Sequence, residues 1–469
     1  MTITTTPECT VNLQLESRIL EGWGRTMRSV ADVATVSSAG QVTQAVRAAF
    51  AEDRSLVSRG AGYSYGDPAL NDRGLIVDMS NMNRILSWDP QTGIMDLEPG
   101  VTIGTICECV GHDGWWPPVV PGTRGPTIGG CVAANVHGKN NWKLGPLGEH
   151  VLEIEIVRAD GSLTTCTREQ AESPFHAHVG GFGLLGVITR VRLQMHPSAQ
   201  VLHVEEFSAP QLEDLIAILD RCEGRADYMV GWIDGYALGE ELGRGLMQVA
   251  ETLPPAPDRD GRRGHALPVP PVAQEQLWRL IKPMANDRVL RKVNAAQYLW
   301  GSVHNGRGRF ISRTRFDFFH DFIPNWNRSF TGGTIQYQMF VPFASAGSVF
   351  RTALERAHEI DAPPFLAVLK RHRKDAFLLS EGVDGYSMSM DFHALPHRRA
   401  ELHAMLTKLT GEVVLPAEGR FYLAKDSVLT RDQVTASFGE DRVAAFRELK
   451  RELDPTNVFQ SDMYRRLLA

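Results

Sequence analysis

The sequence predicts an α+β protein of two domains, and three observations lead to that prediction. The chain has 469 residues, which is too long for one ordinary hydrophobic core and suits two domains of roughly 200 residues each. Its first part alternates short apolar strands with amphipathic helices, and its composition shifts near Pro197. Beyond that point, polar and apolar residues alternate between 310 and 374, which indicates a second sheet.

Composition excludes several classes of protein. Apolar residues at 43% and charged residues at 22% are typical of a soluble globular protein, and a net charge of −6 argues against nucleic-acid binding. No apolar run reaches the ~18 residues that a membrane span requires, and the start of the chain, MTITTTPECTVNLQ, lacks the features of an export signal. The six cysteines show no metal-binding spacing. We therefore expect a cytoplasmic protein with reduced cysteines and no metal site.

The first elements frame a glycine-rich loop. Residues 23–36 show no regular period, whereas 41–52 predict an amphipathic helix with apolar positions at Val42, Val46 and Phe50. Strands are expected at 55–59, 75–79 and 95–97, and a further helix at 102–111. A nicotinamide-binding fingerprint would run from its strand into a helix, but the loop after 55–59 runs into another strand. The GxxxxGK[ST] phosphate loop is also missing from the sequence. The first loop is made of Arg59, Gly60, Ala61, Gly62, Tyr63, Ser64, Tyr65, Gly66 and Asp67.

A second glycine-rich stretch, PGTRGPTIGGCVAANVHGK at 121–139, has the features of a ligand-binding turn. Its Thr-Ile-Gly-Gly step, residues 127–130, lets the backbone approach a ligand closely, and the helix start there offers free N–H groups to an anion such as diphosphate. Small residues at Cys131, Ala133 and Ala134 leave room for a flat group. We interpret the two glycine-rich stretches as converging halves of one flavin dinucleotide site. A third cluster, 179–188, would by itself indicate only tight strand packing.

The rest of the chain predicts a hairpin, a proline-rich loop and a pocket wall. Asp160-Gly161 predicts a tight turn between strands at 151–158 and 162–166. Six prolines within 254–271 exclude regular structure, and a substrate lid and a long connection are equally good interpretations. Gln336 and Gln338 lie two apart in a predicted strand, so their amides share a face, which we interpret as a pocket wall. Other elements are expected at 209–223, 228–233, 335–341, 366–370 and 442–453.

Four motifs together resemble those of the vanillyl-alcohol oxidase family of flavoenzymes: RGAGYSYGD, PGT…TIGG…HGKN, GGFGLLGVI and DPTNVF. The resemblance covers nearly the whole chain and is weakest between about 201 and 302. It implies a PCMH-type FAD-binding domain made of residues 1–196 and 410–469, and an antiparallel-sheet substrate domain over 197–409. By motif match, FAD would contact Arg59, Gly60, Ala61, Gly62, Tyr63, Ser64, Gly66, Asp67, Gly122, Thr127, Ile128, Gly129, Gly130, Ala134, Asn135, His137, Ile188 and Tyr422. The substrate pocket would hold Tyr65, Lys139, Phe319, Gln336, Gln338, Lys370, Ser387, Ser389, Asp391 and Lys425.

Two departures from the family pattern matter. Tyr63 stands where covalently flavinylated relatives carry histidine, so non-covalent FAD is expected. Ser389 and Ser387 stand where the branch that oxidises polyprenyl-phosphate-linked pentoses carries cysteine and asparagine. These two changes leave the substrate open but not the chemistry.

The resemblance implies oxidation of a secondary alcohol on a sugar or sugar-like substrate by hydride transfer to flavin N5, with a polyprenyl-phospho-pentose among the candidate substrates. Such a reaction needs a group that takes the hydroxyl proton and a positive charge near the flavin. Lys425 is the first candidate, and its structural alternative is an ion pair with Asp426. Lys139 is the second, with a diphosphate contact as the rival role. Tyr65 would relay the proton, Gln338 and Gln336 would orient hydroxyls, and His137 would support FAD.

Alternative functions stay open. An aldonolactone or alditol oxidase of the same family, a natural-product flavoenzyme acting on a non-sugar substrate, and a non-catalytic protein that kept the fold are the three that we consider. A partner reductase is implied by resemblance only. Arg259, Arg262 and Arg263 in the proline-rich loop could contact an anionic headgroup at a membrane surface, or the loop could simply be mobile. The choice between oxygen and a quinone as electron acceptor is also open.

Overall fold

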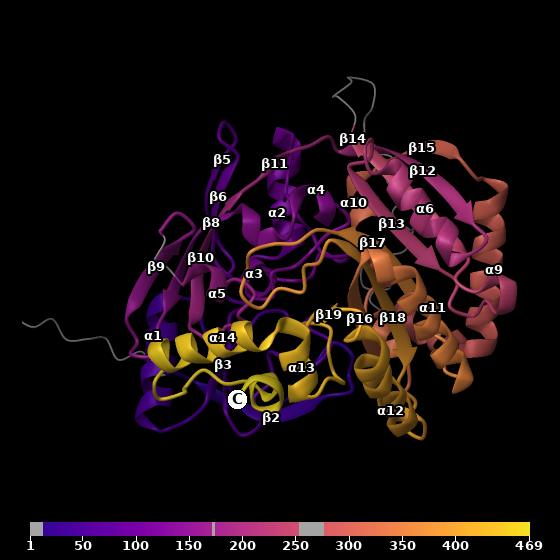
Figure 1. Ribbon diagram of the computed structural model, residues 1–469. Coiled ribbons are helices and arrows are strands. Elements are labelled where there is room, and N and C mark those ends of the chain that lie inside the picture. The colour runs from indigo at the N-terminus through magenta and orange to yellow at the C-terminus, as the bar shows by residue number, and fades with distance from the viewer. Residues whose placement is uncertain (1–12, 171–173, 253–275) are drawn as a thin grey trace, which may run out of the picture.

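A computed structural model describes residues 13–170, 174–252 and 276–469 (Figure 1). The predicted proline-rich loop at 254–271 lies outside the described residues, as does Cys9. Helices and strands are mixed along the chain and confirm the α+β class. Within the described residues the strands form four sheets, of four, five, two and eight strands.

The first glycine-rich stretch is the loop that follows β3, a strand of the first sheet. The order of this sheet is β1-β2-β4-β3, with β1 antiparallel to β2 and the other pairs parallel. The helix expected at 41–52 is confirmed, and its Val42 and Val46 are buried. Phe50 is exposed, because the buried stripe of Val42, Ala45, Val46 and Ala49 leaves it at the edge of that face near the end of the helix. The elements are β1 (Leu15–Glu21), β2 (Arg28–Thr35), α1 (Ala39–Ala51), β3 (Leu56–Arg59) and β4 (Leu75–Asp78).

The second sheet is entirely antiparallel and packs against the second glycine-rich stretch. Its order is β5-β6-β10-β8-β9, and its core includes Ile128 and Val132 of the short helix α3. The predicted hairpin is confirmed: β8 pairs with β9, and Gly161 takes the left-handed conformation, with φ 76°. The elements are β5 (Ile85–Asp89), β6 (Ile94–Leu97), α2 (Ile103–Val110), α3 (Ile128–Ala133), α4 (Asn141–Leu144), β8 (Val151–Val157), β9 (Leu163–Thr167), α5 (Phe175–His178) and β10 (Val187–Gln194), with β7 (Trp115–Trp116) and β11 (His196–Pro197) forming the two-stranded sheet.

The eight-stranded sheet is antiparallel throughout, in the order β15-β12-β14-β13-β17-β18-β16-β19. Helices α6 and α11 lie side by side against it and are seen in front of it in Figure 1. The elements are β12 (Val201–Ala209), α6 (Leu212–Cys222), β13 (Tyr228–Ile233), β14 (Gly245–Thr252), α8 (Leu277–Ile281), α9 (Asp287–Val303), β15 (Arg307–Ser312), α10 (Arg313–Asp317), β16 (Thr334–Pro342), α11 (Phe343–Glu359), β17 (Leu366–His372) and β18 (Gly385–His393).

The last part of the chain contacts both the eight-stranded sheet and the first sheet. β19 (Arg420–Phe421) pairs with β16, and the backbone N–H of Leu56 in β3 donates to the carbonyl of Val458 at 2.7 Å. Arg466 pairs with Asp67 of the first glycine-rich loop at 2.7 Å. The tail therefore holds the first loop against the large sheet. Its helices are α12 (Arg399–Leu409), α13 (Arg431–Phe438) and α14 (Glu440–Leu453). The short 3-10 and π segments are Gly111–Asp113, Leu147–His150, Gly239–Glu241, Lys282–Met284, Phe319–Phe322, Trp326–Ser329, Thr410–Val414 and Tyr464–Leu468.

Candidate functional site

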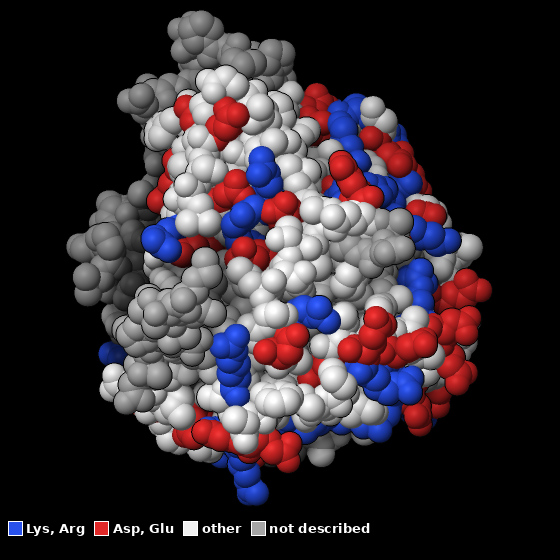
Figure 2. Space-filling model, turned by 90° about the vertical axis from the view of Figure 1, so that its left-hand side faces the viewer, with Lys and Arg blue, Asp and Glu red and all other residues white. Residues whose placement is uncertain are grey.

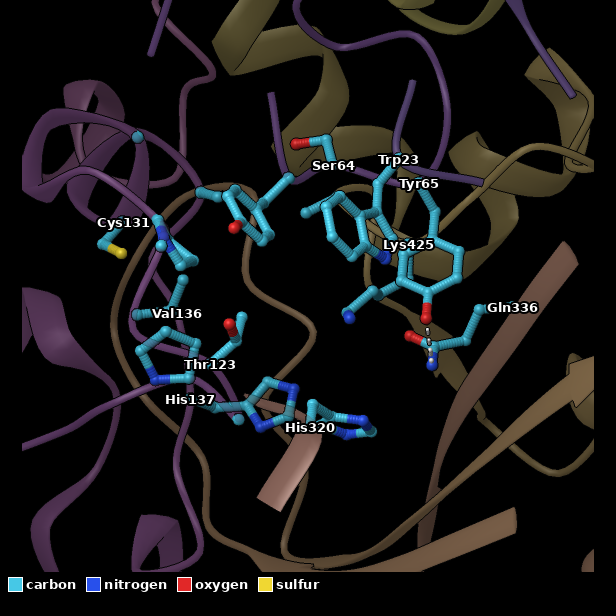
Figure 3. A pocket seen from close by; sticks show the side chains of 18 of the residues that line it. Trp23, Ser64, Tyr65, Thr123, Cys131, Val136, His137, His320, Gln336 and Lys425 are labelled. Carbon is cyan, nitrogen blue, oxygen red and sulfur yellow. Dashed lines mark hydrogen bonds between the residues drawn. The ribbon is translucent and has the colours of Figure 1, made fainter. Parts of the chain in front are cut away.

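A cavity of about 610 Å³ lies between the two glycine-rich stretches and one face of the eight-stranded sheet. Its walls come from the loop after β3, from the segment around α3, from β16, β17 and β18, and from the segment after β19. Figure 3 shows side chains from these separate parts of the chain pointing toward one space. A volume of this size is typical of a site for a cofactor or small molecule.

The two glycine-rich stretches lie side by side, as the sequence predicts. A Cβ atom on Gly60 would lie 2.1 Å from Oγ1 of Thr127, and one on Gly129 would lie 2.6 Å from Cβ of Pro99. Both distances are too short for any larger side chain, so these positions need glycine for close approach. Trp23 stacks on Tyr63 with ring centroids 4.4 Å apart, which fixes the outer side of the first loop.

A hydrogen-bonded carboxylate stands in the sheet wall. The register of β16 and β18 places Gln336 opposite Asp391, and the Gln336 amide donates to that carboxylate at 2.7 Å. The Tyr65 hydroxyl donates to the other oxygen of Asp391 at 3.0 Å. Figure 3 shows the Tyr65 hydroxyl turned toward Gln336. Burial raises the pKa of Asp391 to about 6, although Gln336, Lys425 and Tyr65 oppose this rise. Burial and Asp391 hold the pKa of the Tyr65 phenol well above its usual value.

Three lysines reach into the same cavity. The ammonium of Lys425 lies 4.5 Å from the ring centroid of Tyr65, and loss of hydration lowers its pKa to about 8. Loss of hydration, with repulsion from Lys139 and Lys425, lowers the pKa of Lys370 to about 7. Neither Lys425 nor Lys370 has a hydrogen bond or ion pair within the described parts of the chain. The alternative of a Lys425–Asp426 ion pair is wrong, because Asp426 pairs with Arg466 at 2.9 Å.

Lys139 has a different setting from the other two lysines. Its ammonium donates to the carbonyl of Phe316 and lies 4.2 Å from the centroid of that ring. Loss of hydration lowers its pKa to about 8, although Asp317 raises it. Lys139 is therefore anchored in the cavity wall by the carbonyl of Phe316, whereas Lys370 and Lys425 are free to meet a ligand.

A histidine cluster lies behind the lysines. Gln338 contacts Nε2 of His137 at 3.1 Å and the hydroxyl of Ser387 at 3.4 Å, and that hydroxyl contacts His372 at 2.8 Å. Burial, together with Lys370, His372 and Lys425, holds the pKa of His137 well below its usual range. A histidine that stays neutral in this way is a poor proton acceptor, which fits the expected supporting role of His137.

Most of the predicted residues line the cavity, and six do not. Those that line it are Gly60, Ala61, Gly62, Tyr63, Ser64, Tyr65, Gly122, Thr127, Gly129, Gly130, Ala134, His137, Lys139, Ile188, Phe319, Gln336, Gln338, Lys370, Ser389, Asp391, Tyr422 and Lys425. Those that stand behind its wall are Arg59, Gly66, Asp67, Ile128, Asn135 and Ser387.

Each of these six has another role. Arg59 donates to the carbonyls of Ala69 and Glu21. A Cβ on Gly66 would lie 2.0 Å from the carbonyl of Asp426. Asp67 pairs with Arg466, Ile128 packs in the core, and the Asn135 side chain accepts a hydrogen bond from the N–H of Gly148. The sequence analysis predicts that these six residues contact a ligand directly. In the structure they do not line the cavity but support the residues that do.

Several cavity residues were missed by the sequence interpretation. His320 lines the cavity, and loss of hydration, with Lys425, Lys139 and Lys370 nearby, lowers its pKa to about 3. Trp23, Thr123 and Trp326 also line it. Thr123 lies within the PGT motif but was not assigned a contact, whereas Trp23, His320 and Trp326 lie outside the motifs, so the sequence carries no local signal for those three. Further lining residues come from β12, β13, β14 and α9, and are Glu206, Val230, Trp232, Leu246, Gln248 and Gln297.

The residues present fit an anionic cofactor with a flat ring and polar edges. Nδ1 of His137, the hydroxyl of Tyr422 and Oε1 of Gln336 are buried, and the described residues offer them no hydrogen-bond partner. Buried polar atoms without a partner are costly, so a ligand that satisfies them would be stabilised. Backbone without side chains at Gly60, Gly129 and Gly130 supplies the close approach that a dinucleotide needs. No group of three or more potential metal ligands occurs among the described residues.

Comparisons with known proteins agree with this fit. A family model described as an FAD binding domain matches residues 30–167. The chain is 31% identical to decaprenylphosphoryl-beta-D-ribose oxidase of Mycolicibacterium smegmatis over 98% of this chain and 99% of the relative. It is 26% identical to L-gulonolactone oxidase of Mus musculus over 41% of this chain and 43% of the relative, and 26% identical to a putative D-arabinono-1,4-lactone oxidase of Neurospora crassa over 38% and 32%. None of the helices described is long and apolar enough to cross a bilayer. The chain therefore belongs to the PCMH-type FAD-binding oxidases of the vanillyl-alcohol oxidase superfamily and is an FAD-dependent oxidoreductase.

Proposed function

We propose that the protein oxidises a secondary alcohol of a sugar or sugar-like molecule to a ketone. The observation that carries the proposal is the group formed by Lys425, Tyr65, Gln336 and Asp391, which stands in one wall of the cavity with a free ammonium beside a hydrogen-bonded carboxylate. Oxidation of an alcohol requires removal of the hydroxyl proton and stabilisation of the charge that remains on oxygen. This group has the chemistry for both.

Bound FAD would supply the two-electron acceptor, taking the hydride from the carbinol carbon at flavin N5. Lys425 would hold the substrate oxygen by a charge-assisted hydrogen bond while its proton leaves. Tyr65 would accept that proton as it passes its own to Asp391, whose pKa of about 6 leaves it largely ionised at neutral pH. The C–H and O–H bonds break, the C=O bond forms, and the proton ends on the carboxylate. Gln336 and Gln338 would orient the other hydroxyls.

We further propose that FAD is held non-covalently by the segments 1–196 and 410–469, and that 197–409 holds the substrate. Tyr63 supports non-covalent binding, because a tyrosine stands at the position of the histidine to which covalent relatives attach the flavin. The return of the tail to β3 and to Asp67 supports the split domain. The residues assigned to FAD and substrate contacts are those predicted above that line the cavity.

The substrate that we favour carries a pentose joined to a lipid phosphate. The support is the relative whose name states that it oxidises decaprenylphosphoryl-beta-D-ribose, matched over nearly the whole of both chains. A cytoplasmic location, a partner reductase and contact with a membrane surface go with this proposal. An aldonolactone or alditol oxidase is the second candidate, favoured by the two lactone oxidases, which match a smaller share of the chain.

Purified protein tests the proposal. It should be yellow, should release FAD on denaturation, and should be bleached anaerobically by a substrate. A panel of a polyprenyl-phospho-riboside, an aldonolactone and an alditol separates the two candidates, since only the true class should bleach the flavin quickly. A flavin that none of these reduces, in protein that retains FAD, would exclude both.

A further inference from the structure

Helix α9 turns its more apolar side away from the protein. Its inner side is formed by Asn294 and Gly301, both buried, and a Cβ on Gly301 would lie 2.3 Å from the side chain of Leu246. The outer side carries exposed apolar residues, with Leu299, Trp300 and Val303 exposed by 65%, 67% and 64%. We call Val293, Ala296, Leu299, Trp300 and Val303 the outer face of α9. Their spacing of three and four residues keeps them on one side of the helix.

The surroundings of this face are strongly cationic. Residues 277–317 contain nine lysines and arginines but only two aspartates, in a chain whose net charge is −6. Arg313 is buried and pairs with Asp317, and Arg309 pairs with Glu206, so seven of the nine are exposed cations with no ion pair to another described residue. Arg288 and Lys292 flank the outer face, are exposed, and have no ion pair within the described residues. By contrast, the side of the molecule shown in Figure 2, which faces left in Figure 1 and is opposite α9, has positive and negative residues interspersed.

The same surface borders the cavity. Gln297 of α9 lines the cavity, and so does Phe319, which is 67% exposed. Exposed apolar side chains also occur in the elements just before α9, at Leu280 and Met284. Apolar and cationic groups are therefore combined where the cavity approaches the surface.

We propose that the outer face of α9 binds the surface of an anionic lipid bilayer. A helix with tryptophan and aliphatic residues on one side and basic residues at its flanks is typical of interfacial binding, and tryptophan prefers the level of the headgroups. A second copy of the chain is a poorer occupant, because a symmetric contact would set this cationic surface against itself. The binding itself does not depend on the proposed function. Only its consequence does, namely that a lipid-linked substrate would enter the cavity from the bilayer.

Vesicle sedimentation tests the proposal with the FAD-loaded full-length protein. Binding is expected to vesicles of phosphatidylcholine with phosphatidylglycerol, to be weak on phosphatidylcholine alone, and to fall as salt is raised. Leu299→Ser with Trp300→Ser should lower the partition at least about tenfold. Arg288→Gln with Lys292→Gln should lower it about thirtyfold on anionic vesicles, from two lost cations. The matched control is Ile19→Ser with Leu163→Ser, which changes exposed apolar residues of β1 and β9 and should leave binding unchanged.

Three outcomes would overturn the proposal: no binding to anionic vesicles, equal losses in the control and in the α9 variants, or self-association of the free protein that the Leu299→Ser/Trp300→Ser change abolishes. The last would assign the face to a second copy instead. Anaerobic bleaching by a water-soluble substrate should be unchanged in all these variants. A loss of bleaching in a variant that still binds vesicles would bear on the function and not on the membrane surface.

Discussion

Replacing Lys425 by methionine should remove most of the alcohol oxidation while leaving FAD bound. Methionine nearly preserves the length of the side chain, so the change removes the ammonium with little loss of packing. At a pKa of about 8, the ammonium is mostly protonated at pH 7. At an effective dielectric constant of ~20, its attraction to an oxyanion ~3 Å away is at most roughly 5 kcal/mol. Removal of one preorganised donor typically costs about 3 kcal/mol, so we expect anaerobic flavin reduction to slow by about 10²–10³-fold.

The variant has a second expected signature, in its pH profile. Lys425 lowers the pKa of Asp391, so its removal should raise that pKa further above about 6. The carboxylate would then stay protonated to higher pH, and the ascending limb of the rate profile should move toward alkaline pH. Stopped-flow bleaching at a series of pH values measures both effects, and the ratio of flavin to protein absorbance reports FAD retention. Lys374→Met, which removes an exposed lysine near Asp384, is the matched control. A bleaching rate within about threefold of the natural protein, with an unmoved profile, would refute the role of Lys425.

Three further predictions concern the relay, the loops and the cavity charge. Tyr65→Phe removes the hydrogen bond to Asp391 and should slow bleaching by about 10²-fold with FAD retained; an unchanged rate would exclude the relay. Gly60→Ala should push Thr127 away and lower FAD occupancy, measured from the absorbance ratio, whereas Gly224→Ala, where a Cβ meets nothing within 4 Å, should not; equal occupancy in both would contradict the close approach of the loops. FAD should bind more tightly at pH 7 than at pH 9. A bound anion raises the lowered pKa values of Lys370 and Lys425, so binding takes up protons, and protons are scarce at high pH. Titration calorimetry that shows no proton uptake on binding would contradict this linkage.

The sequence predicts the local elements well where apolar residues alternate or repeat at the helical period. The helix at 41–52, the strands at 55–59 and 335–341 and the hairpin at 160–161 are confirmed. No regular period was seen in 23–36, and the strand β2 in that stretch was therefore missed. β2 buries the small residues Ser29 and Ala31 together with Val33, and small residues hide the alternation. β1 was not predicted at all, since nearly every residue of that strand is exposed and carries no apolar pattern.

The candidate site divides in the same way. Tyr65, in RGAGYSYGD, and Gln336 and Lys425, in the family-like stretches IQYQ (335–338) and YLAKDS (422–427), could be assigned by resemblance. His320 lies in no motif and enters the cavity only through the fold. The six predicted residues that stand behind the wall show the limit of a motif. A stretch such as 59–67 contains residues that face the cavity and residues that hold the loop in place, such as Asp67 with Arg466, and sequence spacing does not separate the two.

The register between β16 and β18 determines which polar side chains face the cavity. β16 is buried on both faces: Ile335, Tyr337 and Met339 enter the hydrophobic core, and Gln336 and Gln338 face the cavity. A slip of one residue would exchange the two sets and leave amides in an apolar core. The pairing of Gln336 with Asp391 is thus enforced by the core on the other side of the sheet. Among the carboxylates that line the cavity, Asp391 is the one without an ion pair to another described residue. The other three, Glu206, Asp317 and Asp321, pair with Arg309, Arg313 and Arg124. Two ammonium groups facing one carboxylate leave the cavity with positive charge that an anionic ligand would neutralise. The sheet core and the preference for an anionic cofactor are therefore consequences of the same register.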